Sequence, residues 1–370
     1  MQDKEYMRMA LELAARAKGF TNPNPMVGAV IVKDGRIIGT GYHRKCGEFH
    51  AERNALADCR ERGEDATGAT LYVTLEPCCH YGKTPPCTEA ILEAGISRVV
   101  VGCGDANPLV AGKGIAILRE HGVTVDEGVL EEECLALNKI FFHYMKTKRP
   151  YVVFKYAMTM DGKIATVTGA SKWITGSAAR EHVHWMRHEL MGIMVGIRTV
   201  ELDDPMLDCR IPGLKSPVRI VCDSTLRISE ESRIVKTAET NRTIIATCSK
   251  DADKRNRLEE RHCEILVTEE KEGRVDLNEL MEKLGAMGID SILLEGGATL
   301  GWEALKSGVV NEVHTFLAPK IFGGATAPGP VGGCGVNLPD ESIKLRRKNC
   351  QWFGDDLLIE SEVFSCLPES

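Results

Sequence analysis

The feature that most constrains the fold is an alternation of short apolar strands with amphipathic helices along the whole chain. Thr70–Leu75 and Arg98–Gly102 are β-branched apolar runs typical of buried strands, and a helix-like segment follows each. Strands that alternate with helices predict a mixed or parallel sheet with helices on its faces, so the predicted fold class is α/β. The predicted strands are Val27–Lys33, Arg36–Gly41, Thr70–Leu75, Arg98–Gly102, Tyr151–Tyr156, Gly192–Gly196, Val218–Cys222, Thr243–Thr247, Ser291–Leu294 and Glu312–Leu317. The predicted helices are Asp3–Lys18, Ala51–Arg62, Thr88–Glu93, Ile115–Glu120, Glu131–Tyr144, Gly176–Glu189, Leu277–Gly285 and Trp302–Lys306.

A short basic stretch, Lys146-Thr147-Lys148-Arg149-Pro150, separates two such alternating halves. It follows a predicted helix and precedes a new strand, and its charges are more typical of a solvated linker than of a binding patch. A length of 370 residues also suits two domains better than one. We therefore predict domains at 1–146 and 150–365.

The composition argues against several classes of protein. Lysine and arginine total 46 against 53 aspartate and glutamate, and the net charge of −7 suits neither bulk nucleic acid nor an anionic membrane as a partner. Charge or glycine interrupts the apolar runs well before 18 residues, which predicts no transmembrane helix, and the N-terminus lacks a signal-peptide pattern. Fourteen cysteines in such a chain indicate reduced thiols and a metal site in the cytoplasm rather than disulfides.

The first half carries a histidine, a glutamate and cysteines at spacings that favour a catalytic zinc site. His50 and Glu52 open a predicted helix, Cys78 follows the next predicted strand, and Cys87 starts the helix after it. One imidazole and two thiolates leave a fourth zinc position open for water, whose pKa the metal lowers to about 7. Glu52 is too close to His50 in sequence to chelate comfortably and is placed to shuttle a proton instead. His-x-Glu followed by Pro-Cys is the signature of zinc nucleobase deaminases.

The two residues after Cys78 leave the ligand set open on sequence grounds. Cys79 and His80 could each bind a metal, and together with Cys78 and Cys87 they would make a closed structural zinc site if His50 were free. Cys78 directly follows a proline, where the deaminase signature places a ligand. We therefore favour the open site with Cys78 and Cys87.

The second half lacks the Gly-x-Gly-x-x-Gly fingerprint after its first strand, which disfavours a Rossmann dinucleotide site. It has instead Leu294-Glu295-Gly296-Gly297-Ala298-Thr299-Leu300, in which a strand end meets a glycine-rich turn before the predicted helix Trp302–Lys306. Backbone N–H groups in such a turn can hold a pyrophosphate, although two glycines after a strand are more often a simple tight turn. This pattern alone leaves both interpretations open.

Several motifs of the first half resemble the bifunctional riboflavin-biosynthesis deaminase/reductase family. They are Asn22-Pro23-Asn24-Pro25-Met26-Val27-Gly28, His50-Ala51-Glu52, Leu75-Glu76-Pro77-Cys78, Thr84-Pro85-Pro86-Cys87, Asp105-Ala106-Asn107-Pro108 and Gly112-Lys113-Gly114. The gap of eight residues between Cys78 and Cys87 is normal in that family. The position of Cys79 is more often Ser there, so the resemblance implies that Cys79 is not a ligand. The resemblance implies a cytidine-deaminase-like α/β/α sandwich, with zinc on His50, Cys78 and Cys87 and with Glu52 as the catalytic residue. It also implies a substrate pocket lined by Asn24, His43, Lys83, Thr84 and Asn107.

Motifs of the second half resemble the dihydrofolate-reductase-like α/β reductase domain of the same family, over about residues 151–330. They are Lys155-Tyr156-Ala157-Met158-Thr159-Met160-Asp161-Gly162-Lys163-Ile164-Ala165, Ser171-Lys172-Trp173-Ile174-Thr175, Gly196-Ile197-Arg198-Thr199-Val200, Asp203-Asp204-Pro205, Pro217-Val218-Arg219 and Ala318-Pro319-Lys320. The resemblance implies NADPH as the cofactor of this domain. The residues it implies for cofactor binding are Ala157, Trp173, Thr199, Asp203, Ser224, Gly297, Ala298, Thr299 and Leu300. The residues it implies for substrate binding are Lys155, Ser171, Arg187, Leu207, Arg210 and Glu295.

Together these resemblances imply two consecutive reactions of riboflavin synthesis on one phosphorylated pyrimidine. The expected first step is zinc-dependent hydrolytic deamination of 2,5-diamino-6-(5-phosphoribosylamino)pyrimidin-4-one. The expected second step is NADPH-dependent reduction of the ribosyl group, giving 5-amino-6-(5-phosphoribitylamino)uracil. The family also implies a homo-oligomer formed through the reductase domain. The alternative is a zinc deaminase of a free base, a nucleoside or tRNA with an accessory domain, which the insert at 82–86 and the whole second half disfavour.

Overall fold

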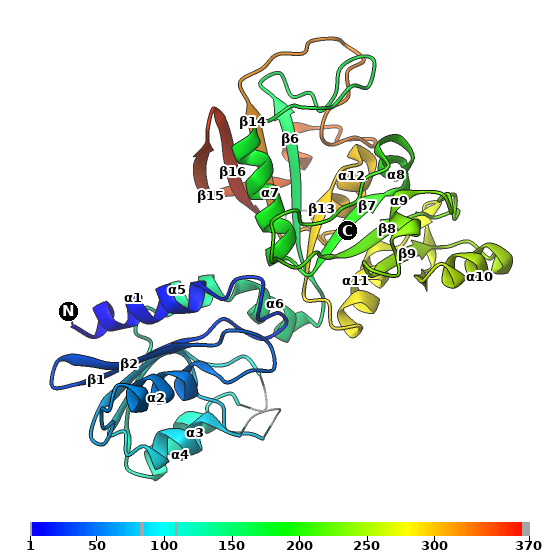
Figure 1. Cartoon of the computed structure of the whole chain (residues 1–370). Helices are drawn as coiled ribbons and strands as arrows, with labels where there is room; N and C mark the ends of the chain where they lie inside the picture. The colour runs from blue at the N-terminus through cyan, green and yellow to red at the C-terminus, as the bar shows by residue number, and fades with distance from the viewer. Residues whose placement is uncertain (1, 82–84, 108–109, 365–370) are drawn as a thin grey trace. The chain divides into compact units, whose positions relative to one another are not determined.

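The computed structural model of the chain describes residues 2–81, 85–107 and 110–364 (Figure 1). Its contacts divide it into two compact units, Met1–Lys148 and Arg149–Ser370, each with its own hydrophobic core. The division falls inside the basic stretch between the two alternating halves. None of the helices in the described part of the chain has the length and apolarity that crossing a bilayer requires.

A five-stranded sheet in the order β2-β1-β3-β4-β5 forms the middle of the first unit. β1 runs antiparallel to β2 and β3, whereas β3, β4 and β5 are parallel to one another. Asp34 and Gly35 make the tight turn between β1 and β2, with φ angles of 51° and 75°, as the Asp-Gly pair predicts. The strands are β1 (Gly28–Lys33), β2 (Arg36–Tyr42), β3 (Thr70–Leu75), β4 (Arg98–Cys103) and β5 (Thr124–Glu127).

Helices cover both faces of this sheet and give the first unit three layers (Figure 1). α1 and α5 lie on one face, whereas α2, α3 and α4 lie on the other. Glycines let the helices approach the strands closely, because a Cβ atom on Gly28 would lie 1.9 Å from the Ala10 carbonyl oxygen and one on Gly41 would lie 2.3 Å from the Ala55 nitrogen. The helices are α1 (Gln2–Ala15), α2 (Ala51–Glu61), α3 (Cys87–Glu93), α4 (Lys113–Glu120), α5 (Glu131–Leu137) and α6 (Lys139–Thr147).

The segment Glu131–Tyr144, predicted as one helix, is broken at Asn138 into α5 and α6. Asn138 is 2% exposed, and its side-chain amide bonds the backbone of Met26 twice. Its Oδ1 accepts from the Met26 N–H and its Nδ2 donates to the Met26 carbonyl, each at 2.8 Å. The helix breaks here because Asn138 pairs with this distant loop and leaves helical geometry, with φ of −108°.

The second unit is built on a nine-stranded sheet in the order β10-β9-β8-β7-β13-β6-β14-β16-β15. From β10 to β14 neighbouring strands are parallel, so their carboxyl ends lie along one edge, whereas β16 and β15 are antiparallel. A separate antiparallel pair joins β11 and β12. The strands are β6 (Tyr151–Thr159), β7 (Gly192–Gly196), β8 (Val218–Cys222), β9 (Thr243–Thr247), β10 (Cys263–Val267), β11 (Glu270–Lys271), β12 (Arg274–Val275), β13 (Ser291–Glu295), β14 (Glu312–Ala318), β15 (Lys344–Phe353) and β16 (Asp356–Phe364).

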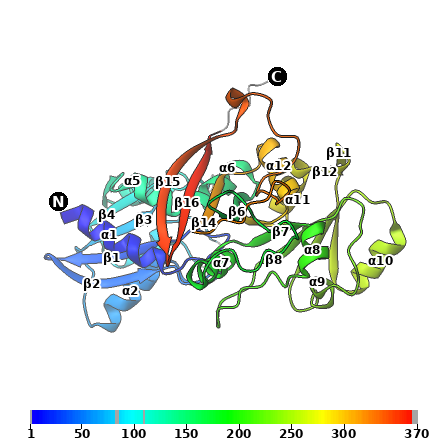
Figure 2. The same cartoon turned by 90° about the horizontal axis from the view of Figure 1, so that it is seen from above.

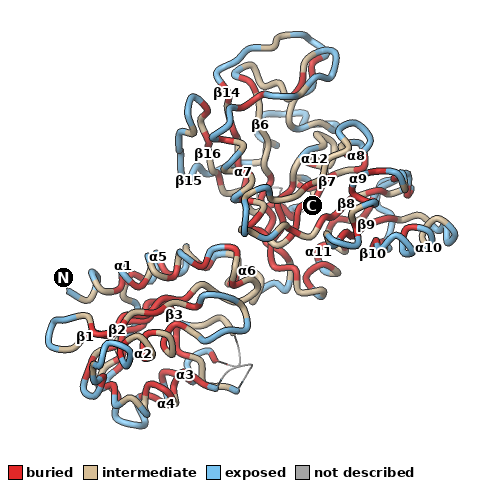
Figure 3. The backbone as a smooth tube through the Cα atoms, in the orientation of Figure 1, coloured by how far each residue is buried: buried red, intermediate tan, exposed pale blue. Residues whose placement is uncertain are grey.

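Two apolar clusters fill the two sides of this second sheet. One joins the sheet to α11 and α12, and the other joins it to α8, α9 and α10. The central strands are accordingly buried along most of their length, whereas α10 is largely exposed (Figure 3). The helices are α7 (Ser177–Glu189), α8 (Ile197–Asp203), α9 (Arg233–Lys236), α10 (Ala252–Glu260), α11 (Leu277–Ala286) and α12 (Ala298–Lys306), with a short 3₁₀ turn at Pro339–Glu341.

β15 and β16 form a long hairpin at one edge of the second unit's sheet (Figure 2). Nine of the ten residues of β15 are exposed, and among them are the large side chains of Leu345 and Trp352. The strand is rich in lysine and arginine, so the apolar alternation that would have predicted it is missing.

The helix after β13 also differs from its prediction. It begins at Ala298 and not at Trp302, because Gly296 and Gly297 complete the turn with φ angles of 79° and 83° and the chain enters the helix at once. The residues 298–300, expected in a turn, therefore form the first turn of α12. The α/β class is confirmed for both units.

Candidate active sites

Three potential metal ligands meet beside the carboxyl end of β3. His50 is the N-cap residue of α2, Cys87 is the first residue of α3, and Cys78 lies between β3 and α3. The Nδ1 atom of His50 lies 3.4 Å from the Sγ of Cys78 and 3.4 Å from the Sγ of Cys87, and all three atoms fall within 4.8 Å of one another. Zinc bonds of about 2.0 Å to nitrogen and about 2.3 Å to sulfur place tetrahedral ligands roughly 3.5 Å apart. The cluster therefore has the dimensions of a zinc site.

The pKa values of the two thiols in this cluster are linked by the hydrogen bond between them. A hydrogen bond from Cys87, with a second from His50, lowers the pKa of Cys78 to about 4. The same bond to Cys78, together with burial, raises the pKa of Cys87. One thiolate thus suppresses ionisation of the other. A bound cation removes that conflict, since a coordinating thiol loses its proton outright, and the donor set therefore fits a metal ion.

Glu52 lies in the first turn of α2 and lines the same cavity as His50 and Cys78, although it is only 3% exposed. Burial raises the pKa of Glu52 to about 7, and the negative charge of Cys78 contributes to the shift. A carboxyl group that titrates near neutral pH can both accept a proton and return it.

Cys79 and His80 stand outside this cluster. Within the described residues, the group that could hold a metal ion comprises His50, Cys78 and Cys87. Burial raises the pKa of the Cys79 thiol, and the nearby charge of Glu76 raises it further, so the thiolate that a metal needs is disfavoured. The closed four-ligand alternative does not match this geometry.

A cavity of about 280 Å³ adjoins the cluster, and Asn24, His43 and Asn107 all line it. Lys83 and Thr84, expected in the same pocket, lie outside the described residues. The Nδ1 of His43 donates to the Phe49 carbonyl at 3.1 Å, which leaves Nε2 as an acceptor 3.4 Å from the Asn24 amide nitrogen. Burial lowers the pKa of His43, which favours this neutral ring. Two polar groups ordered in this way can form hydrogen bonds with the polar edge of a pyrimidine ring.

Several cavity residues were not singled out from the sequence. Phe141 and Met145 of α6 line the cavity, and so does Asp105, whose pKa burial raises to about 6. Glu76 also borders it and holds the wall in place. Its carboxylate accepts from the backbone N–H of Gly112 at 2.9 Å and of Gly114 at 3.0 Å, at the start of α4. The Glu-Pro-Cys motif carries no pattern that would reveal this distant partner.

The second unit gathers charged side chains at the carboxyl ends of its parallel strands. Lys155 of β6 and Glu295 of β13 are paired in register, and their charged atoms lie 3.7 Å apart. Arg187 of α7 makes two parallel hydrogen bonds to the Glu295 carboxylate, at 2.9 and 3.0 Å. Burial opposes the charge of Glu295, but Arg187 and Lys155 outweigh it and lower the pKa of Glu295 to about 2. Burial lowers the pKa of Lys155, and the charge of Glu295 opposes that shift.

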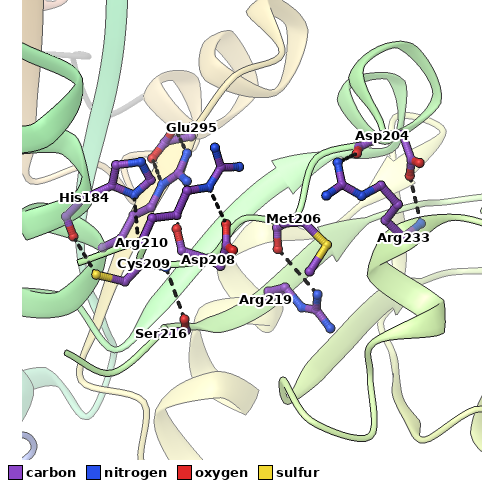
Figure 4. A network of polar contacts seen from close by, with 11 residues as sticks. His184, Asp204, Met206, Asp208, Cys209, Arg210, Ser216, Arg219, Arg233 and Glu295 are labelled. Carbon is purple, nitrogen blue, oxygen red and sulfur yellow. Dashed lines mark hydrogen bonds and ion pairs between the residues drawn. The ribbon is translucent and has the colours of Figure 1, made fainter. Parts of the chain in front are cut away.

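The loop between α8 and β8 brings two further predicted substrate residues to this cluster. Figure 4 shows Asp208, Cys209 and Arg210 of the loop beside His184 and Glu295. The Asp208 carbonyl accepts from Arg187 at 3.0 Å, and the Asp208 carboxylate accepts from the Arg210 guanidinium at 3.2 Å. Leu207, the other predicted residue, is buried with a positive φ of 54°. The structure thus brings Lys155, Arg187, Arg210 and Glu295 into one neighbourhood.

Two glycines after β13 form an open turn beside α8. A Cβ atom on Gly296 would lie 3.3 Å from the Thr199 hydroxyl, and one on Gly297 would lie 3.6 Å from the Cβ of Leu300. α12 begins directly after this turn, so its first N–H groups have no partner within the helix. Exposed backbone N–H groups at the start of a helix can bind a pyrophosphate.

The other predicted cofactor residues follow the same edge of the sheet. Ala157 is on β6, Asp203 ends α8, and Ser224 follows β8, where its hydroxyl accepts from the Val275 N–H at 3.1 Å. Ser171 and Trp173 lie on the segment between β6 and α7. The Trp173 ring is 60% exposed, with the Arg180 guanidinium 4.5 Å from its centre.

Two family models match separate parts of the chain. The model of the cytidine and deoxycytidylate deaminase zinc-binding region matches residues 1–103, and the model of the RibD C-terminal domain matches residues 150–359. The riboflavin biosynthesis protein RibD of Actinobacillus pleuropneumoniae is 53% identical over 99% of this chain and 97% of its own length. The chain belongs to the RibD family. RibD of Escherichia coli is 41% identical, over 97% of this chain and 99% of its own length.

Solved structures of the RibD family have the same fold over nearly the whole chain. One is the diaminohydroxyphosphoribosylaminopyrimidine deaminase/5-amino-6-(5-phosphoribosylamino)uracil reductase of Thermotoga maritima. It is 40% identical, with a TM-score of 0.87 over 98% of this chain and 99% of that one. Acinetobacter baumannii RibD is 36% identical, with a TM-score of 0.88 and the same coverage. The expected deaminase-like and reductase domains are therefore both confirmed, and the family is one of bifunctional riboflavin-biosynthesis enzymes.

Proposed function

We propose that this chain deaminates 2,5-diamino-6-(5-phosphoribosylamino)pyrimidin-4-one and then reduces the ribosyl group of the product. The observation that carries the proposal is the cluster of His50, Cys78 and Cys87 beside Glu52 in one cavity. The full-length match to RibD relatives supports the pairing of both activities in one chain.

In the first unit, His50, Cys78 and Cys87 would hold the zinc ion. When bound, zinc supplies a Lewis acid that makes water nucleophilic at neutral pH. Glu52 takes the proton from the attacking water and delivers it to the amine that leaves as ammonia. Asn24, His43 and Asn107 orient the pyrimidine in the cavity, and we assign Lys83 and Thr84 to its phosphoribosyl part. Phe141 and Met145 add an apolar wall that excludes water.

In the second unit, NADPH would lie along the carboxyl edge of the sheet and supply the hydride that reduces the sugar at C1. The turn at Gly297 and the first turn of α12 (Ala298, Thr299 and Leu300) would hold the pyrophosphate together with Thr199. Trp173 offers an exposed aromatic face. We assign Ala157, Asp203 and Ser224 to the same cofactor from their places along this edge.

Two arginines suit the phosphate of the substrate, because a guanidinium binds phosphate oxygens through paired N–H donors. The Arg210 side chain is 58% exposed and pairs with the Asp208 carboxylate at 3.2 Å. Arg187 is fixed by Glu295, and Lys155 completes the cluster. We assign Ser171 and Leu207 to the same substrate site.

A two-stage assay tests the proposal. The zinc-loaded chain is given the phosphorylated diaminopyrimidine, and ammonia release is followed first. NADPH is then added, and its oxidation is followed by the loss of the absorbance of the reduced nicotinamide. We expect ammonia release first and then NADPH oxidation that depends on it. Ammonia without NADPH oxidation would indicate the alternative, a single-function zinc deaminase, and release from cytosine or adenosine would strengthen that alternative.

The cytoplasmic location and the homo-oligomer formed through the reductase unit stay predictions. The exposed outer strand β15 supports the second of them, because an uncovered strand edge can pair with another copy.

A further inference from the structure

Two histidines of α7 contact the loop that carries Leu207 and Arg210. His184 and His188 are one helical turn apart, so their side chains project from the same face of the helix. The backbone N–H of Arg210 donates to Nδ1 of His184 at 3.4 Å, and the backbone N–H of Lys215 donates to Nδ1 of His188 at 3.2 Å. The two rings therefore hold the loop at two points five residues apart in sequence (Figure 4 shows the first).

These two hydrogen bonds require a particular protonation state in each ring. A backbone N–H can only donate, so Nδ1 must be unprotonated in each ring, and the hydrogen of the neutral imidazole must be on Nε2. Burial lowers the pKa of His184, and the positive charges of Arg187 and Arg210 lower it further, whereas Asp208 opposes them. Glu295 also faces this ring. His188 is 1% exposed, and its ring lies nearly perpendicular to the Trp185 ring, with the ring centres 6.3 Å apart.

The loop needs such contacts because residues 204–217 contain neither helix nor strand. Other bonds tie its ends, such as the Arg233 N–H to the Asp204 carboxylate at 2.8 Å and the Cys209 N–H to the Ser216 hydroxyl at 3.1 Å (Figure 4). The Cys209 thiol also donates to the His184 carbonyl at 3.3 Å. Ordering a residue costs backbone entropy, so a loop that is already ordered loses less entropy when it binds substrate.

We propose that His184 and His188 are positioning residues of the reductase site, which hold the loop at 207–215 in its substrate-binding arrangement as neutral hydrogen-bond acceptors. This inference rests on the proposed reductase function. The ligand concerned is the phosphorylated substrate that Arg187 and Arg210 face. Protonation of either ring removes the acceptor and releases that point of the loop.

Two pairs of variants of the full-length chain test the inference. His184→Leu and His188→Leu keep a similar volume but have no acceptor. His184→Asn and His188→Asn keep an acceptor, because the asparagine Oδ1 occupies the place of the histidine Nδ1. We expect each leucine variant to raise the reductase KM for the deaminated substrate about three- to tenfold with little change in kcat, as the loss of one hydrogen bond implies. We expect each asparagine variant to stay within about twofold of the parent chain.

A pH profile separates positioning from simple packing. In the parent chain, KM should rise as the pH falls, because a ring protonated at both nitrogens cannot accept from the loop. The double variant with asparagine at 184 and 188 should lose this extra rise, while the titration of the substrate phosphate remains in both profiles. Parallel profiles for the two chains, or an asparagine variant as impaired as the leucine variant, would overturn the inference.

Controls in the same chain keep the test interpretable. His262→Asn changes an exposed histidine between α10 and β10 and should leave KM unchanged. Deaminase activity reports whether each variant is intact in the first unit, and a thermal melt reports folding of the second. If the parent chain itself does not oxidise NADPH, the proposed reductase function fails. If the parent chain is active and the leucine variants keep its KM, only the positioning role fails.

Discussion

Glu52 and Glu295 are both buried carboxylates, but their surroundings move their pKa values in opposite directions. Burial raises the pKa of Glu52 to about 7, with an added contribution from the negative charge of Cys78. Burial acts in the same direction on Glu295, but Arg187 and Lys155 overcome it and hold its pKa at about 2. One residue is thus prepared to exchange protons, whereas the other is a fixed negative charge that orders its neighbours.

The Glu52→Gln variant should separate proton transfer from metal binding. The amide keeps the size of the side chain but cannot carry a proton, so we expect deamination to fall roughly a hundredfold or more. Zinc content, measured by elemental analysis, should stay near that of the parent chain, since Glu52 is outside the ligand cluster. Glu61→Gln, at the exposed far end of α2, serves as the control. Undiminished ammonia release by Glu52→Gln would contradict the role proposed for this residue.

The Glu295→Gln variant should change how stability depends on pH. The pKa of Glu295 is about 2 in the folded chain against about 4.3 in an unfolded one, so its carboxylate stabilises the fold above about pH 4.5 and loses this effect as the pH falls toward 2. Removing it leaves Arg187 and Lys155 uncompensated, at a cost of about 3 kcal/mol at neutral pH.

Urea unfolding of the second unit at pH 7 and pH 3.5 measures this effect. We expect a smaller difference between parent and Glu295→Gln at the lower pH. Glu270→Gln, on exposed β11, should behave like the parent chain. An equal loss of stability at both pH values would show that the charge of Glu295 is not the cause.

At the scale of elements, loops tied to distant backbone shape both sites. Glu76, at the end of β3, accepts from the first N–H groups of α4, where the positive end of the helix dipole favours a carboxylate. Asn138, between α5 and α6, bonds the backbone of Met26 and so fixes the loop that carries Asn24. The walls of the deaminase cavity are therefore held by polar side chains that lie outside the proposed chemistry.

The Glu76→Gln variant should loosen one wall of that cavity. The neutral amide loses the charge-assisted bonds to Gly112 and Gly114, at a cost of about 1–3 kcal/mol. We expect a lower melting temperature for the first unit and a higher deaminase KM, because Asp105 and its neighbours line the cavity on this side. Glu120→Gln, at the exposed other end of α4, should change neither quantity. A variant with normal melting and KM would rule out this role for Glu76.

At the scale of the whole molecule, each site is built within one unit. The deaminase cavity is lined by residues of the first unit, and the charged cluster around Glu295 belongs to the second. The hydrophobic cores are separate as well. A lesion at one site should therefore leave the chemistry of the other intact.

Complementation between two variants tests this independence. Glu52→Gln should still oxidise NADPH when it is given the deaminated substrate, and Arg210→Ala should still release ammonia from the first substrate. A mixture of the two should convert the starting compound to the ribityl product, which chromatography of the reaction mixture would detect. Failure of the mixture, with each variant active in its own step, would show that the intermediate does not pass between chains.

The sequence by itself determined the local features whose signals are local. Strand β3 begins and ends at the predicted residues because Thr70–Leu75 is a continuous apolar, β-branched run, and β7, β8 and β9 also begin and end where predicted. The motif around His50, Cys78 and Cys87 predicted the metal cluster because ligand type and spacing are properties of the chain itself. Polar and weakly patterned segments, such as β15 and α10, were not predicted, because few of their residues are buried.

Only the tertiary structure decided which distant groups meet. No sequence spacing joins Glu76 to α4, Asn138 to Met26, or the histidines of α7 to the loop before β8. These contacts depend on how helices and loops pack against the sheets. That packing brings polar groups from distant parts of the sequence together, and because a buried polar group needs a hydrogen-bond partner, they bond to one another. The residues of the candidate metal cluster could therefore be predicted from the sequence, whereas the residues that hold them in place became visible only in the fold.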